Sequence, residues 1–183
     1  MIENYLIKHC SPTLASLKTA GLFSFSYLSK NNLNCQIEFC NNMLNPKGVY
    51  VTVLKDNGAS ALIYVYRRKN LIKDLAQEGV YNLMKKYGYI YTDIDYAIKK
   101  LKRRFMFSST FPHEIGLFLG YPLSDVIGFI EHSGKQSKAT GYWKVYGDVT
   151  YAMDKFNKYN KCRRVYEKLY QSGTSIQKLT VTV

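Results

Sequence analysis

Acidic residues are scarce in this sequence of 183 residues. Asp and Glu number 13 against 26 Lys and Arg, so the formal net charge is +13. Residues 67–104 hold 11 basic and 4 acidic residues, residues 135–168 hold 9 and 3, and the rest of the chain is balanced. Such an imbalance favours an anionic partner, although a basic face that is merely solvated has the same composition.

Long apolar runs are also absent. No window supplies the roughly 18 to 20 apolar residues that a membrane-spanning helix needs. The first ten residues, MIENYLIKHC, lack the basic start and apolar core of a signal peptide. We therefore expect a cytoplasmic protein with no membrane partner.

Cysteine is sparse as well, with Cys10, Cys35, Cys40 and Cys162 as the four in the chain. Cys35 and Cys40 lie five residues apart, and no second Cys or His pair nearby completes a zinc-binding pattern. The cysteine pattern thus predicts free thiols, most of them buried, and no metal site.

Proline occurs only four times, and each proline marks a boundary between elements. Pro112 and Pro122 suit the first position of a helix, and they predict helices over 113–119 and from 122 onward. Ser11 followed by Pro12 predicts an N-cap and the start of another helix, which Gly21 weakens or ends.

Hydrophobic periodicity gives the fold class. Two β-type runs flank Asn57-Gly58 and predict an antiparallel hairpin over 49–66. Short strands are expected near 142–146 and 176–183. Further helices are expected over 2–9, 32–44, 71–87, 92–105 (N-cap Thr92) and 148–172 (N-cap Asp148). The prediction is an α+β fold in which a small antiparallel sheet packs with about six helices, as one domain over 1–183.

The stretch 111–148 combines groups that suit chemistry with apolar residues that need burial. It holds the only tryptophan, two of the three histidines and six of the twelve glycines. We therefore expect a functional site to include this stretch.

Four motifs resemble one bacterial family. They are FPHEIGLFLGYP at 111–122, GYWKVY at 141–146, HCSPTL at 9–14 and LIYVYR at 62–67. On these motifs the chain resembles DUF3793, a family catalogued as a domain of unknown function, over essentially its whole length. The resemblance implies no activity.

The candidate catalytic residues are Cys10, His113 and Glu114. A thiol just before a helix start has a lowered pKa, which would make Cys10 a nucleophile. A neutral imidazole can accept a proton near neutral pH, so His113 could act as a general base. The alternatives are a buried, inert thiol, a structural His–Glu pair, or a metal or haem site built from these residues with His9.

An anion could bind between the predicted helix start and the 111–121 corner. His9, Ser11 and Thr13 lie at the helix start, where unpaired N–H groups favour anions. Arg67 follows the second hairpin strand, where a guanidinium could hold a carboxylate or phosphate, and Lys144 adds a second cation. The sequence therefore predicts a protein that binds, and could transform, a small anionic ligand; the cofactor is left unknown.

Two other functions remain open. The basic helices over 92–105 and 148–172 could bind nucleic acid weakly and without sequence preference. The chain could also be a non-catalytic interaction or scaffold protein.

Overall fold

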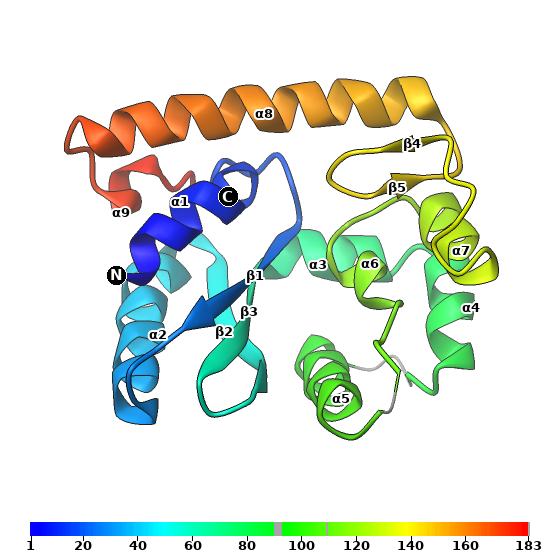
Figure 1. Cartoon of the computed structure of the whole chain (residues 1–183), viewed down its shortest axis with the longest axis horizontal. Coiled ribbons are helices and arrows are strands. Elements are labelled where there is room, and N and C mark those ends of the chain that lie inside the picture. Colours follow the sequence, from blue (N-terminus) through cyan, green and yellow to red (C-terminus); the bar gives the residue numbers. More distant parts are fainter. Residues whose placement is uncertain (90–92, 109, 183) are drawn as a thin grey trace.

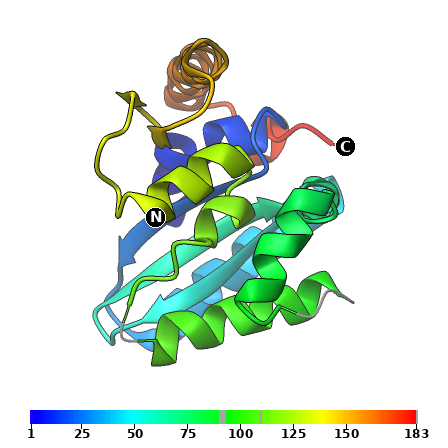
Figure 2. The same cartoon turned by 90° about the vertical axis from the view of Figure 1, so that its right-hand side faces the viewer.

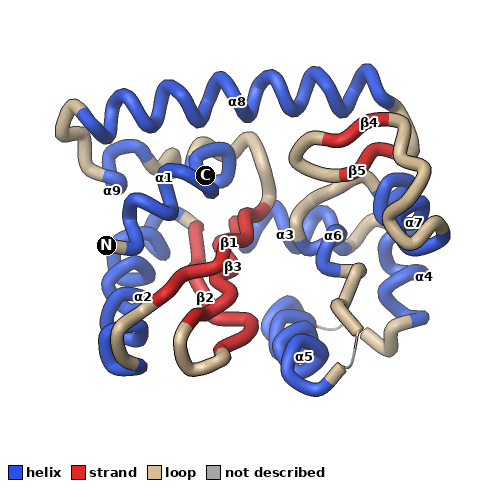
Figure 3. The backbone as a smooth tube through the Cα atoms, in the orientation of Figure 1, coloured by secondary structure: helices blue, strands red, loops and turns tan. Residues whose placement is uncertain are grey.

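A computed structural model describes residues 1–89, 93–108 and 110–182. Its main sheet has three antiparallel strands, β1 (Ala20–Ser26), β2 (Val49–Asp56) and β3 (Ser60–Arg67), in the order β1-β3-β2 (Figures 1 and 3). The predicted hairpin is β2–β3, and its turn is as the sequence indicates. Gly58 has a left-handed φ of 89°, and the Asn57 side chain accepts hydrogen bonds from the amides of Ala59 and Ser60.

Helices cover both faces of this sheet (Figure 2). One apolar cluster joins a sheet face to α1 (Ile2–Leu14), α2 (Lys30–Leu44) and α9 (Ile176–Leu179). A second joins the other face to α3 (Arg68–Leu75), α4 (Glu78–Lys86), α5 (Ile94–Phe107), α6 (Ile115–Phe118) and α7 (Leu123–Glu131). The predicted α+β class is correct. Within the described residues no helix is both long and apolar enough to cross a membrane.

The predicted helix start at Ser11–Pro12 is wrong. Helix α1 begins at Ile2 and runs through Pro12, which lies in its last turn and removes only one hydrogen bond near the helix end. Ser16 then takes a left-handed φ of 59° where the chain leaves the helix. Residues 20–26 form strand β1, a strand that the sequence pattern did not predict; Phe23 and Phe25 bury on one face of the sheet at strand spacing.

Several other boundaries differ from the prediction. The helix expected over 71–87 is the two helices α3 and α4, and the one expected over 113–119 is the four-residue α6. Helix α5 takes its N-cap from Asp93, while Thr92 lies outside the described residues. Where a strand was expected near 176–183, residues Ile176–Leu179 form the short helix α9. The Ser175 side chain accepts a hydrogen bond from the amide of Lys178, and Ile176 and Leu179 are buried in the same apolar cluster. The described residues therefore hold nine α-helices, not about six, and a 3-10 turn at Asn45–Lys47.

The strand expected near 142–146 is shorter and lies outside the main sheet. It is β5 (Lys144–Val145), which pairs with β4 (Ala139–Thr140) as a separate small hairpin. Helix α8 (Val149–Gln171) follows it, with the predicted cap at Asp148 accepting from the amide of Tyr151. Figure 1 shows α8 crossing the molecule from the β4–β5 hairpin to α1 and α9.

Arg67, the last residue of β3, connects its strand to two segments that are distant in the sequence. Its side chain is 2% exposed, and its guanidinium donates to the carbonyls of Thr13 (2.6 Å), Leu14 (2.5 Å) and Val181 (2.8 Å). These acceptors are the end of α1 and the C-terminal segment. A guanidinium at the negative end of a helix is favourable, and here it also satisfies buried carbonyl groups.

We predict that Arg67→Met lowers the free energy of unfolding by about 3 kcal/mol, because it removes the charge-assisted hydrogen bonds that tie β3 to the end of α1 and to the C-terminal segment. Urea unfolding measures the change. Arg164→Met on the exposed side of α8 is the matched control and should cost no more than about 0.5 kcal/mol. Equal costs for the two variants would contradict a joining role for Arg67.

Candidate functional site

A pocket of about 300 Å³ lies among β1, the 111–121 corner, α7 and the β4–β5 hairpin. Its lining is mostly aromatic and aliphatic. The residues around it are Leu22, Phe111, His113, Ile115, Gly116, Leu119, Tyr121, Asp125, Val126, Phe129, Thr140, Gly141, Trp143 and Lys144. All but Leu22 come from the stretch 111–148 that the sequence singles out.

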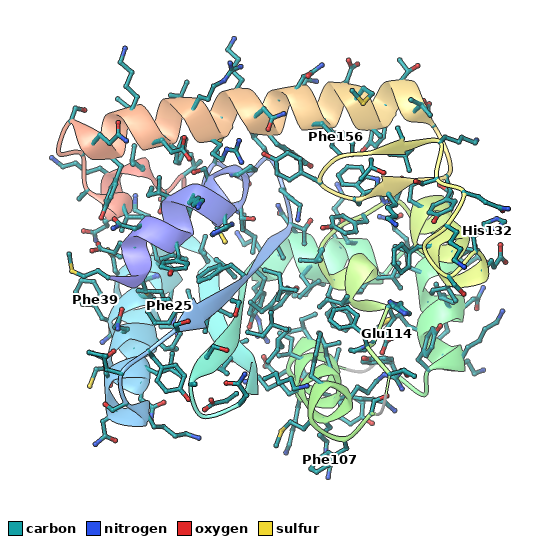
Figure 4. The ribbon with its side chains drawn as sticks, in the orientation of Figure 1. Phe25, Phe39, Phe107, Glu114, His132 and Phe156 are labelled. Atoms are coloured by element: carbon teal, nitrogen blue, oxygen red, sulfur yellow. The ribbon has the colours of Figure 1, made fainter. Side chains whose placement is uncertain are left out.

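The corner over 111–121 is held from inside by Glu114. This carboxylate is fully buried and forms an ion pair with Arg104 of α5. Arg104 Nη2 lies 3.5 Å from Glu114 Oε2. Arg104 Nε lies closer to Glu114 Oε1 but makes no hydrogen bond. The hydroxyl of Tyr89 donates to Glu114 Oε1 at 3.1 Å. Figure 4 shows Glu114 inside the molecule, between α5 and α6. Glu114 therefore anchors the corner, a role that differs from the predicted catalytic one.

Close packing of α6 against α7 forms the floor of the pocket. A Cβ at Gly116 would lie 2.8 Å from Cγ2 of Val126, so glycine permits this approach. Gly120 then turns the chain with a φ of 71° and leads it into α7, whose N-cap is Pro122. The helix predicted from residue 122 onward begins at Leu123, with Pro122 as its N-cap.

Asp125 fixes the hairpin wall of the pocket. It is 3% exposed, and its Oδ2 accepts from the Trp143 indole N–H at 2.6 Å. Its Oδ1 accepts from the amides of Tyr146 (2.8 Å) and Gly147 (2.7 Å). With three N–H donors this carboxylate is satisfied within the protein, so it shapes the site and is not free to bind a ligand.

Two groups of aromatic rings line the pocket. Trp143 stacks on Tyr121 at 5.0 Å between ring centroids, and the Tyr121 hydroxyl donates to the carbonyl of Tyr142 at 3.0 Å. Burial raises the pKa of Tyr121 to about 12, so this phenol stays neutral at physiological pH. In the second group the His113 ring lies 5.1 Å from Phe129 and 5.7 Å from Phe111.

Lys144 supplies a cation at the rim. Its ammonium donates to the carbonyl of Gly134 at 2.6 Å and lies 6.0 Å from the centre of the Phe129 ring. An ammonium has three N–H donors, so two remain for a ligand. His113, also exposed, adds a second polar group at the same opening.

Lys18 supports the wall from behind. This buried ammonium donates to the carbonyls of Ala20 and Leu119, the latter at 3.1 Å, and lies 4.9 Å from the centre of the Tyr121 ring. Burial lowers its pKa to about 8. Lys18 could not be found from the sequence, because a lone lysine is ordinarily exposed. The wall residue Asp125 could not be found either, because an acid in a first helical turn needs no further partner.

The structure brings together only part of the predicted site. His113 and Lys144 line one pocket, and Glu114 lies next to His113 but faces the α5 network. His9, Cys10, Ser11, Thr13 and Arg67 are not among the lining residues. The guanidinium of Arg67 donates to backbone carbonyls, so Arg67 is not available to bind an anion as predicted.

The α1 residues differ from their predicted roles because no helix begins there. Ser11 donates to the carbonyl of Ile7, and Thr13 is buried. His9 stacks on Phe23 at 5.7 Å; burial, followed by the charges of Lys8 and Arg163, lowers its pKa. Within the described residues no group of three or more His, Cys, Asp or Glu side chains could hold a metal ion.

Cys10 is fully buried in the third turn of α1, and a Cβ at Gly21 would lie 2.6 Å from its Sγ. Burial raises the pKa of the Cys10 thiol to about 12, against a smaller opposing effect of Lys18. The prediction of a lowered pKa assumed a helix N-terminus at Pro12, and that premise is wrong. The thiol of Cys10 is protonated and shielded at neutral pH.

The fold and pocket define an α+β protein with an aromatic-lined cavity where α6, α7 and a small hairpin meet. A family model described as "Protein of unknown function (DUF3793)" matches residues 6–180. The chain belongs to this family, as its four motifs predict. No curated protein and no solved structure was found to match it.

We predict that iodoacetamide labels Cys35 first and Cys10 last in the folded protein. Cys35 is exposed, whereas Cys10, Cys40 and Cys162 are buried. Mass spectrometry of timed samples at pH 7 to 9 gives the labelling rate of each thiol. Labelling in urea is the control, because in the unfolded chain all four thiols should react at similar rates, with pKa values near the free-thiol value of about 8.5. Native labelling of Cys10 as fast as that of Cys35 would restore Cys10 as a nucleophile.

Proposed function

We propose that the protein binds a small, planar, largely apolar molecule that carries one acidic group. Its ring system occupies the pocket between Trp143 and Phe129, and its acidic group contacts the ammonium of Lys144. The proposal keeps the small anionic ligand and the 111–121 corner that the sequence indicates. It replaces the 9–13 segment by α7 and the β4–β5 hairpin.

One observation carries this proposal: an aromatic cavity has an ammonium at its rim and no free carboxylate. Among the described lining residues, Lys144 is the one Lys or Arg and Asp125 the one acid, and Asp125 is satisfied by three N–H donors. An anionic group at the rim therefore meets a cation without a competing acid. Ligand sites of this size typically combine apolar walls with a few polar groups that fix orientation.

The shape of the lining favours a flat ligand. Two pairs of aromatic rings line it: Trp143 stacks on Tyr121, and the Phe129 ring lies 5.1 Å from His113. Aromatic rings pair in offset-stacked or edge-to-face arrangements, which a planar guest can adopt and a branched chain cannot. His113 contributes an aromatic surface together with a nitrogen that can donate or accept a hydrogen bond at the opening.

We further propose that binding takes place in the cytoplasm. All four cysteines are free, as the sequence predicts. Free thiols are usual in a reducing compartment.

We predict that 2-naphthoate binds this pocket more tightly than the uncharged 2-naphthalenemethanol, as measured by calorimetric titration. Lys144→Met should weaken 2-naphthoate about tenfold, because it removes a charge-assisted contact. The same variant should leave 2-naphthalenemethanol unchanged. Thr140→Phe, which narrows the pocket, should weaken both molecules.

Lys135→Met is the matched control, because Lys135 is exposed and does not line the pocket. It should leave both affinities as they are. If neither molecule binds, or if the two lysine variants behave alike, the pocket is not a site for aromatic acids.

A further inference from the structure

A second surface groove runs along the outer face of α5, away from the aromatic pocket. It has a volume of about 530 Å³ and is lined by Tyr96, Lys99, Lys100, Arg103, Arg104, Phe107 and Ser108. Four of these seven residues are cations and none is acidic. Figure 4 shows Phe107 at the outer edge of the molecule, on α5.

The lining residues form one stripe because of their spacing. Tyr96, Lys100, Arg103 and Phe107 are separated by four, three and four residues, the spacing of one helix face. Eleven residues separate Tyr96 from Phe107, which puts them about 20° apart around the helix and roughly 16 Å apart along it. The stripe therefore has an aromatic ring at each end and cations between them.

Two of the cations are free to bind a partner. Lys100 donates to the carbonyl of Gly88, and Arg104 is paired with Glu114. Lys99 and Arg103 are exposed and have no ion-pair or hydrogen-bond partner in the described part of the chain. The neighbouring Asp95 is engaged by Arg68 at 2.7 Å, so it does not offset these charges.

The two aromatic rings are also open to solvent. Phe107 is 79% exposed and Tyr96 is 42% exposed. Ring faces beside a row of cations are the combination with which proteins hold single strands, since bases stack on the rings and phosphates contact the cations.

We propose that this face of α5 binds single-stranded nucleic acid without sequence preference. A lipid bilayer fits the face less well, because insertion requires an apolar helix face. The apolar face of α5 (Ala97, Ile98, Leu101, Phe105) is buried in the protein core. The site is independent of the aromatic pocket and does not depend on its function.

The test is fluorescence anisotropy with a labelled 12-nucleotide oligothymidine at about 50 mM salt, a condition that favours phosphate contacts. A duplex of the same length and vesicles of mixed neutral and anionic lipid are compared. The oligothymidine should bind more tightly than the duplex. Its affinity should fall with salt with a logarithmic slope of about −1.4, as expected for two phosphate contacts on a single strand.

Variants separate this site from net charge alone. Lys99→Glu with Arg103→Glu should weaken oligothymidine binding at least about tenfold. Lys158→Glu with Lys161→Glu makes the same charge change on exposed positions of α8 and should weaken it less than about threefold. Phe107→Ala should weaken it about tenfold through lost stacking, whereas Met106→Ala, also exposed, should have little effect.

Four results would each overturn the proposal. They are no binding at about 50 mM salt, equal losses from the α5 and α8 charge pairs, duplex bound as tightly as single strand, and binding to anionic vesicles in place of oligothymidine. Circular dichroism of each variant establishes that the helices remain folded.

Discussion

In the folded chain the buried carboxylate of Asp125 accepts hydrogen bonds from the Trp143 indole and from the amides of Tyr146 and Gly147. A buried carboxylate that lost these donors would cost several kcal/mol. If the hairpin β4–β5 separated from α7, the Asp125 carboxylate would therefore become exposed or would stay buried without its hydrogen-bond donors. This constraint holds Trp143 against Tyr121 in the lining of the pocket. The two-residue strands of this hairpin would be marginal on their own.

The hairpin is held from its other side by α8. Phe156 packs edge-on against Trp143 at 4.5 Å, and a Cβ at Gly141 would lie 2.3 Å from the Phe156 ring. Helix α8 also packs along α1, so it ties the pocket to the opposite end of the molecule. The ion pair between Arg104 and Glu114 links α5 to the 111–121 corner, which carries His113. The aromatic pocket and the basic face of α5 are thus separate surfaces connected by the ion pair of the partly buried Arg104 with the buried Glu114.

Local signals in the sequence predicted the elements that local chemistry determines. Asn57-Gly58 specifies the β2–β3 turn, and Asp148 specifies the start of α8. Long-range packing decided the rest: Ser11–Pro12 has a strong helix-start pattern, yet α1 extends through it because Leu6, Cys10 and Leu14 bury against the sheet. His113 and Lys144 could be found because they belong to a stretch rich in Trp, His and Gly. The roles of Arg67 and Lys18 could not, because a buried cation satisfied by backbone carbonyls leaves no pattern in the sequence. Cys10 was assigned to the site because its predicted reactivity depended on a helix N-terminus that does not exist.

Trp143 is the only tryptophan, so its indole N–H gives a single, identifiable signal from the pocket wall. The most direct test of the central claim is a titration of ¹⁵N-labelled protein with 2-naphthoate, followed by ¹H–¹⁵N correlation spectra. The account predicts saturable shifts that are largest for the Trp143 indole and for the amides of residues 113–119 and 139–144. Saturable shifts centred on residues 9–13, with the Trp143 indole unmoved, would contradict it.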